Sequence, residues 1–102
     1  MKYKYKILNV NDKERWINIR SDVDFDYEEP DSFVYFVKMI RGDVNGTAEN
    51  IGYMRYSIKN DGYGFIYQWD SLFGITVIYP QGVTEKQARE FLGKYMSEFQ
   101  EK

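Results

Sequence analysis

Alternation of polar and apolar residues at the start of the chain predicts a half-buried β-strand over residues 2–8. Three lysines alternate there with the apolar side chains of Tyr3, Tyr5 and Ile7. A period of two is typical of a strand that has one face in a core. A short helix is expected next, over residues 12–21, because Asn11 and Glu14 have the spacing of a capping box and apolar residues then follow at helical spacing.

The middle of the chain is rich in β-branched and aromatic residues, and it predicts further strands at residues 33–40, 51–59, 64–69 and 73–79. The first of these is a nearly continuous apolar run, which is typical of a strand buried on both faces. Residues 42–50 are polar and are expected to form a turn. Asn60-Asp61-Gly62 predicts a hairpin, because these residue types tolerate a positive φ.

The C-terminal segment predicts an amphipathic helix. Thr84 and Gln87 form a capping box, and apolar residues then recur at three- and four-residue spacing, at Ala88, Phe91, Leu92, Tyr95 and Phe99. The predicted order is β-α-β-β-β-β-α. It gives an α+β fold with an antiparallel sheet of four to five strands and the C-terminal helix packed on one face. Residues 1–102 are expected to form one domain, since domains commonly have this length.

Both faces of the predicted sheet carry apolar side chains. The face away from the C-terminal helix is a candidate contact surface that includes Val34, Phe36, Tyr53, Arg55 and Ile66. A face open to solvent is usually more polar than this. Three explanations fit: the first helix covers the face, two copies of the chain pair through it, or a foreign partner docks on it.

Composition removes several kinds of chemistry. The sequence has neither Cys nor His, which excludes disulfides, the usual zinc sites and nucleophilic catalysis by Cys or His. Fourteen basic and sixteen acidic residues give a net charge of −2, which argues against a nucleic-acid partner or an anionic membrane. Aromatic strands can stack bases, but Lys38, Arg55 and Lys59 are weak support for such binding.

Acidic residues are concentrated between residues 22 and 31, where Pro30 is expected to block a helix. This segment is a candidate partner-binding surface that consists of Asp22, Asp24, Phe25, Asp26, Tyr27, Glu28, Glu29 and Asp31. Its carboxylates would pair with a basic protein partner, and its aromatic residues would anchor the contact. A solvated loop without a partner fits the same pattern. A calcium loop does not, because Tyr27 stands where an EF-hand needs Gly and Phe33 where it needs Glu.

These observations favour a small non-enzymatic binding protein that acts by stoichiometric protein–protein contact, of the immunity-protein or enzyme-inhibitor type. No catalytic residue, metal or cofactor is expected, because no spacing singles out a pair of carboxylates for acid–base work. Two alternatives stay open, a homodimeric structural or accessory domain and a small metal-dependent enzyme that uses carboxylates. A cytoplasmic location is expected, since the chain shows neither a signal peptide nor a membrane-spanning run.

Overall fold

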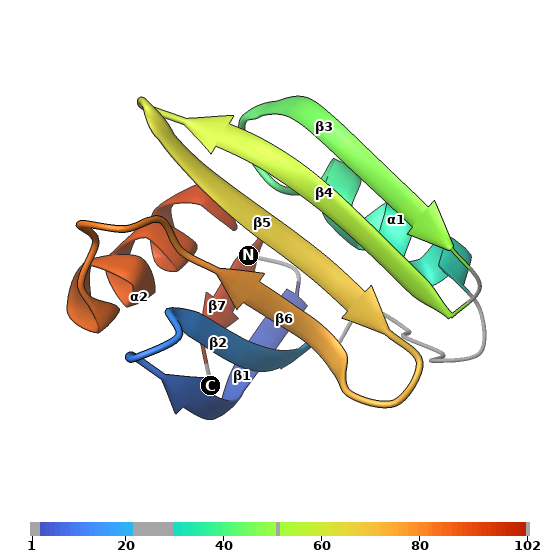
Figure 1. Cartoon of the computed structure of the whole chain (residues 1–102), viewed down its shortest axis with the longest axis horizontal. Helices are drawn as coiled ribbons and strands as arrows, with labels where there is room; N and C mark the ends of the chain where they lie inside the picture. Colours follow the sequence, from blue (N-terminus) through green and yellow to red (C-terminus); the bar gives the residue numbers. More distant parts are fainter. Residues whose placement is uncertain (1–2, 22–29, 51, 102) are drawn as a thin grey trace.

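The computed structural model describes residues 3–21, 30–50 and 52–101, and it shows an α+β fold of two helices and a seven-stranded sheet (Figure 1). The strand order is β3-β4-β5-β6-β2-β1-β7. Neighbouring strands are antiparallel except β1 and β7, which pair in parallel over three residues. The α+β class and the mainly antiparallel sheet are as predicted. The sheet is nevertheless mixed and larger than the expected four to five strands.

The N-terminal part is a β-hairpin of β1 (Tyr3–Asn11) and β2 (Trp16–Ser21). The first strand is confirmed, but the predicted helix over residues 12–21 is wrong. Ile17 and Ile19 are buried and alternate with more exposed residues, so the period is that of a strand. The backbone N–H of Glu14 does donate to the Asn11 side chain, at 2.9 Å. That bond closes the hairpin turn instead of capping a helix.

The apolar run at residues 33–40 lies mostly in helix α1 (Pro30–Lys38), so the predicted strand there is wrong. Phe33, Phe36, Val37 and Ile40 are buried, and their spacing of three and four residues is that of one helix face. A short continuous apolar run fits either element, and periodicity alone does not separate them. Pro30 begins the helix, a position where the missing backbone N–H costs nothing.

A polar segment forms strand β3 (Asp43–Asn50), where the sequence predicted a turn. All eight of its residues are exposed, so it carries no apolar period. It lies at the edge of the sheet, beside the predicted meander of β4 (Tyr53–Asn60), β5 (Tyr63–Asp70) and β6 (Gly74–Ile78). The hairpin between β4 and β5 is confirmed, with φ of 49° at Asp61 and 88° at Gly62.

The C-terminal helix is confirmed as α2 (Glu85–Tyr95), with both hydrogen bonds of the capping box between Thr84 and Gln87. Phe99 was expected on this helix but begins strand β7 (Phe99–Glu101) instead. The chain leaves the helix at Met96, whose carbonyl accepts the N–H of Phe99 at 2.9 Å. No helix in the described ranges is long and apolar enough to cross a membrane.

The core lies between the helices and one face of the sheet. Phe36 of α1 packs against Tyr67, with ring centroids 6.4 Å apart, and Phe91 of α2 meets Phe65 edge-on at 5.8 Å. Tyr67 and Phe65 are two residues apart on β5, so both helices pack on the same face. The first explanation for the two apolar faces, cover by the first helix, is therefore wrong. The opposite face is called the open face below.

Candidate functional site

Strand pairing arranges the side chains of the open face in rows across the sheet. One row runs from β4 through β5 and β6 to β2 and consists of Ser57, Ile66, Ile78 and Trp16. The next row, two residues along each strand, consists of Arg55, Gln68, Thr76 and Asn18. The first row is mainly apolar and the second is polar, so the face offers both kinds of contact side by side.

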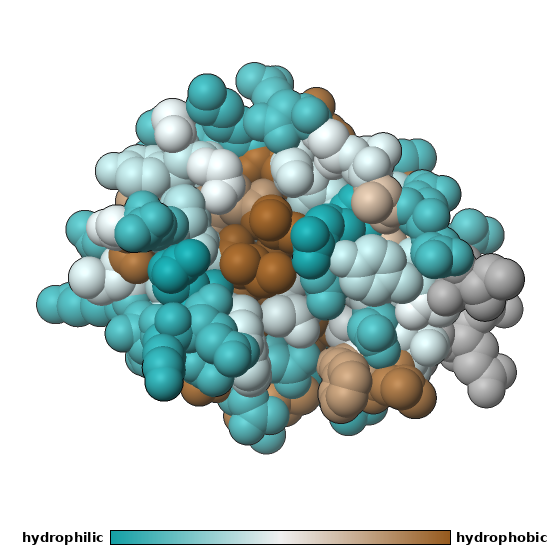
Figure 2. Space-filling model, viewed as in Figure 1, coloured by the Kyte–Doolittle hydropathy of each residue, from teal (hydrophilic) through white to brown (hydrophobic). Residues whose placement is uncertain are grey.

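Apolar side chains reach the surface in two places on this side of the molecule. Ile66 and Ile78 pair across β5 and β6, and Figure 2 shows an apolar patch near the middle of the face with more polar side chains around it. The second place is the turn between β5 and β6, where Leu72 and Phe73 are 83% and 73% exposed. Large apolar side chains this exposed are typical of contact surfaces.

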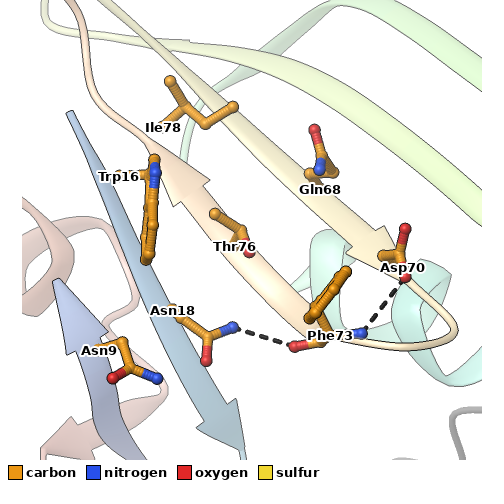
Figure 3. Close-up of a pocket in the computed structure, with 8 residues that line it drawn as sticks. All are labelled: Asn9, Trp16, Asn18, Gln68, Asp70, Phe73, Thr76 and Ile78. Carbon is orange, nitrogen blue, oxygen red and sulfur yellow. Dashed lines mark hydrogen bonds between the residues drawn. The ribbon is translucent and has the colours of Figure 1, made fainter. Parts of the chain in front are cut away.

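A hollow of about 390 Å³ lies on the open face, across β1, β2, β5 and β6 (Figure 3). Its lining is Asn9, Trp16, Asn18, Gln68, Asp70, Phe73, Thr76 and Ile78. Trp16 and Phe73 lie on opposite sides of it, with Thr76 between them (Figure 3). The volume falls within the roughly 300–1,000 Å³ of small-ligand pockets.

The Trp16 side of the hollow is held by the turn between β1 and β2. The Trp16 indole N–H donates to the Glu14 carboxylate at 3.0 Å. The hydroxyl of Tyr79 donates to Asp12 in the same turn, and the Tyr79 N–H donates to the Arg15 carbonyl at 2.9 Å. Burial and the bond to Asp12 both raise the pKa of Tyr79 above its ordinary value.

The Phe73 side of the hollow is a turn fixed by Asp70. One Asp70 carboxylate oxygen accepts the backbone N–H groups of Leu72 and Phe73, at 2.7 and 3.3 Å. The side-chain amide of Asn18 donates to the carbonyls of Phe73 and Ile75, at 3.1 and 2.8 Å, and so ties this turn to β2. The Asn18 side-chain oxygen is an acceptor that these two bonds leave for a ligand.

Next to the hollow, β4 contributes a polar cluster. The Gln68 side-chain oxygen accepts from Arg55 at 2.9 Å and from the Tyr53 hydroxyl at 3.3 Å. The guanidinium of Arg55 also lies 5.8 Å from the centre of the Tyr53 ring, in cation–π geometry. Because the Gln68 oxygen is committed to these donors, its amide nitrogen is the group suited to a ligand acceptor.

The open face is basic although the whole chain is acidic. Residue alternation and strand register place on it the basic side chains of Lys4, Lys6, Arg20, Arg55 and Lys59 and, within the described residues, the acidic side chains of Asp43 and Asp70. The bond to Trp16 adds the carboxylate of Glu14. Lys6 and Arg20 pair directly across β1 and β2. They lie one row beyond Asn18, so basic groups flank the hollow at that end, and Arg55 flanks it on the β4 side.

The predicted acidic surface lies almost wholly outside the described residues. Of its members, the structure describes the surroundings of Asp31 alone, in the first turn of α1, where it is exposed. Docking of a basic partner on residues 22–31 stays a prediction. The described residues contain no group of three or more Asp and Glu side chains arranged to hold a metal ion.

The structure places only part of the second predicted surface on the open face. Tyr53, Arg55 and Ile66 lie on the open face. Val34 and Phe36 do not, because their segment is a helix on the other side of the sheet. Phe36 is fully buried, and Val34 is partly buried against the same core.

Sequence reasoning missed the residues that border the hollow. Trp16 falls within the helix predicted over residues 12–21, and Phe73 falls at the start of the strand predicted over residues 73–79. The alternation of Trp16 and Asn18 with Ile17 and Ile19 is the signal that would have placed Trp16 on an open strand face. No local signal brings Trp16 and Phe73 together, because their proximity depends on the pairing of β2 with β6.

A smaller hollow of about 180 Å³ lies at the other end of β4, beside α2. It is lined by Arg41, Gly42, Asp43, Lys59, Asn60, Asp61 and Tyr95. Asn60 is 5% exposed, and its side-chain amide atoms have no hydrogen-bond partner. Buried amides of this kind commonly bind an ordered water. This hollow is therefore explained without a ligand.

Comparison with known proteins adds no identification. No family model matches the chain, and neither a curated protein nor a solved structure shows significant similarity to it. The arguments for a function therefore come from the open face.

Proposed function

We propose that this protein is a small non-enzymatic binding protein that acts by stoichiometric contact with a macromolecular partner. The open face of the sheet is the proposed contact surface. The observation that carries the proposal is the position of both helices on one side of the sheet, which leaves Trp16, Ile66 and Ile78 in a row on the other side. Strands packed on a core present such side chains on a rigid support.

The residue types on the open face support a contact role. Trp, Tyr and Arg are the residues most enriched among the energetic centres of interfaces, and Trp16, Tyr53 and Arg55 all lie on this face. Phe73 adds a large exposed ring on a turn that Asp70 fixes. A surface already ordered before contact loses less conformational entropy on binding.

The hollow itself favours binding over catalysis. Among the described residues, Asp70 is the one acidic residue of its lining, and this carboxylate already accepts two backbone N–H groups. A general acid and a general base need two titratable groups in reach of one substrate. The other polar lining residues are amides and a threonine, which recognise ligands by hydrogen bonding.

Strand β3 favours a second candidate, a homodimer formed through the edge of the sheet. β3 is an eight-residue edge strand with every residue exposed, and its outer backbone groups face no strand of the described sheet. Such an edge is a template for pairing with another chain. Its charged side chains, Asp43 and Glu49, are the feature that opposes pairing between copies. A solution mass of twice 12.2 kDa would support this candidate, and a monomeric mass would exclude it.

The test of the proposed function is capture and titration with a matched pair of variants. Trp16→Ser with Phe73→Ser alters the open face, and Tyr35→Ser alters an exposed aromatic residue of α1 on the other side. Material co-purified with the wild-type protein is identified, purified and titrated back. We expect saturation at fixed stoichiometry for the wild-type protein and for Tyr35→Ser, and loss of binding in the double variant. Equal binding by all three proteins would refute the open face as the contact surface.

A further inference from the structure

We propose that the partner of the open face is single-stranded nucleic acid, with one base in the hollow between Trp16 and Phe73 and phosphates beside Lys6, Arg20 and Arg55. This inference rests on the proposed function, because it names the partner of the same surface. It uses two independent properties of the face, which are its charge and the chemistry of its hollow.

The charge of the open face is complementary to a polyanion. Five basic side chains stand against three acidic ones among the described residues, which are Glu14, Asp43 and Asp70. Asp70 already accepts backbone N–H groups of its own turn, and Glu14 already accepts the Trp16 indole N–H. Away from this face, the described residues include the acidic side chains of Asp12, Asp31, Glu49, Asp61, Glu85, Glu90, Glu98 and Glu101. The excess of basic side chains on the open face attracts a negatively charged partner to it.

The hollow has the chemistry of a base-binding site. Aromatic rings bind bases of any sequence by stacking, and Trp16 and Phe73 stand on its two sides. Its polar lining includes the amides of Asn9, Asn18 and Gln68, and amides supply the donors and acceptors that base edges require. A base inside a duplex is stacked and paired, so an unpaired strand is the form that fits.

The aromatic hollow and the basic side chains occupy different parts of the open face, as the base and the phosphate of a nucleotide require. Of the residues that the structure describes, no basic one lines the hollow. Arg55 instead pairs with Gln68 on one side of it, and Arg20, two residues beyond Asn18 on β2, pairs with Lys6 at one end. Bases in the aromatic hollow would therefore place phosphates over the basic flanks. An acidic protein segment without aromatic residues would satisfy the flanks but not the hollow. A nucleotide brings a ring and a phosphate in every unit, which favours nucleic acid, and an acidic peptide with aromatic residues is the competing occupant in the tests below.

The first test measures the affinity of the wild-type chain for a fluorescein-labelled 12-nucleotide single strand as salt is varied. Three neutralised phosphates predict a slope of log K against log salt of about −2. Lys6→Gln and Arg20→Gln should each reduce that slope by about 0.7. Lys38→Gln on α1 and Lys86→Gln on α2 are exposed controls on the helical side, and both should leave the slope unchanged.

The second test asks whether a base occupies the hollow. Trp16 lines the hollow, whereas Trp69 is 2% exposed in the core, so stacking should quench the emission of Trp16 selectively. Trp16→Ala should weaken binding roughly 5- to 150-fold, and Trp16→Phe should keep most of the affinity while abolishing the quenching. An abasic strand of the same length should bind far more weakly than the normal one.

Several results would overturn the inference. They are equal affinity for the normal and abasic strands, stronger binding of polyglutamate, of an acidic peptide with Tyr and Phe residues or of duplex than of the single strand, or no binding at low salt. If oligonucleotides fail while a purified protein still binds stoichiometrically and depends on Trp16 and Phe73, the inference falls and the proposed function stands. If no partner depends on those residues, both fall.

Discussion

The indole N–H of Trp16 donates a hydrogen bond of 3.0 Å to the carboxylate of Glu14, two residues earlier in the chain. The same Glu14 donates its backbone N–H to the side chain of Asn11. Together these bonds join the turn between β1 and β2 to the ring that borders the hollow. Glu14 is therefore a positioning residue for Trp16, although it does not itself line the hollow.

Loss of the Glu14 carboxylate should release the Trp16 ring. We expect Glu14→Ala to make the indole more mobile on the nanosecond timescale, while stability falls by about 1 kcal/mol or less, because the bond is exposed. The measurement is time-resolved fluorescence anisotropy in a Trp69→Phe background, where Trp16 is the only tryptophan and is excited selectively at the red edge of its absorption. Glu14→Gln keeps an acceptor oxygen and should retain most of the order. Unchanged anisotropy in Glu14→Ala would show that packing alone holds the ring.

Two buried tyrosines should respond in opposite ways to loss of their hydroxyl groups. The Tyr67 hydroxyl is buried without a partner, whereas the Tyr95 hydroxyl lies 3.2 Å from the Asp61 carboxylate and 3.4 Å from the Asn60 carbonyl. We expect Tyr67→Phe to raise the free energy of unfolding by about 1 kcal/mol and Tyr95→Phe to lower it by a similar amount. Urea denaturation measures both. A destabilised Tyr67→Phe protein would mean that its hydroxyl has a partner in solution.

Substitutions in α1 separate the helical assignment from the strand that the sequence predicted. Phe36 is fully buried and meets Phe99 edge-on with ring centroids 5.3 Å apart, whereas the neighbouring Tyr35 is 53% exposed. Phe36→Ala should cost about 3–5 kcal/mol of stability, and Tyr35→Ala about 0.5 kcal/mol or less. Chemical denaturation of the two variants measures the difference. Similar losses in both would contradict the burial pattern of a helix.

Raised tyrosine pKa values predict cooperative alkaline unfolding. Burial, with a smaller effect of Glu101, raises the pKa of Tyr5 to about 12, and burial also raises that of Tyr67. A phenol in the unfolded chain ionises near pH 10. The stability associated with these groups is therefore fully present below about pH 10 and is lost as the pH rises through the folded-state pKa.

Absorbance at 295 nm and circular dichroism, recorded together during an alkaline titration, test this expectation. A late absorbance step should coincide with loss of secondary structure, and Tyr5→Phe should reduce its amplitude by one tyrosine. Ionisation of every tyrosine near pH 10 with an intact circular dichroism spectrum would contradict it.

The sequence predicted an element correctly where the hydrogen bonds that define it join residues close together in the chain. The capping box of Thr84 and Gln87 needs only residues three apart, and it is present as expected. Asn11 and Glu14 show the limit of the same signal, because one side-chain-to-backbone bond serves a helix start and a tight turn equally well. The apolar run at residues 33–40 fits a helix or a strand equally well, because nearly every position in it is apolar and neither period stands out.

The sequence did not predict the strands whose own residues show no alternation of apolar and polar side chains. β3 is exposed along its whole length, and β7 has only three residues and one buried side chain, Phe99. Both are strands because of the neighbours they pair with. The candidate site shows the same contrast between what the local pattern predicts and what strand pairing decides. Alternation along the predicted strands placed Arg55 and Ile66 on one face, but the gathering of Arg20 and Lys6 beside the hollow depends on strand order.

The parallel pairing of β1 with β7 has a consequence for synthesis of the chain. Tyr3 is aligned with Phe99, so two segments separated by almost the whole described sequence complete the sheet together. While the ribosome is still adding the residues after α2, β1 has one edge unpaired and Phe36 lacks a ring neighbour from β7. An unpaired strand edge with exposed apolar surface is prone to association. The nascent protein should therefore stay prone to association until residues 99–101 have emerged.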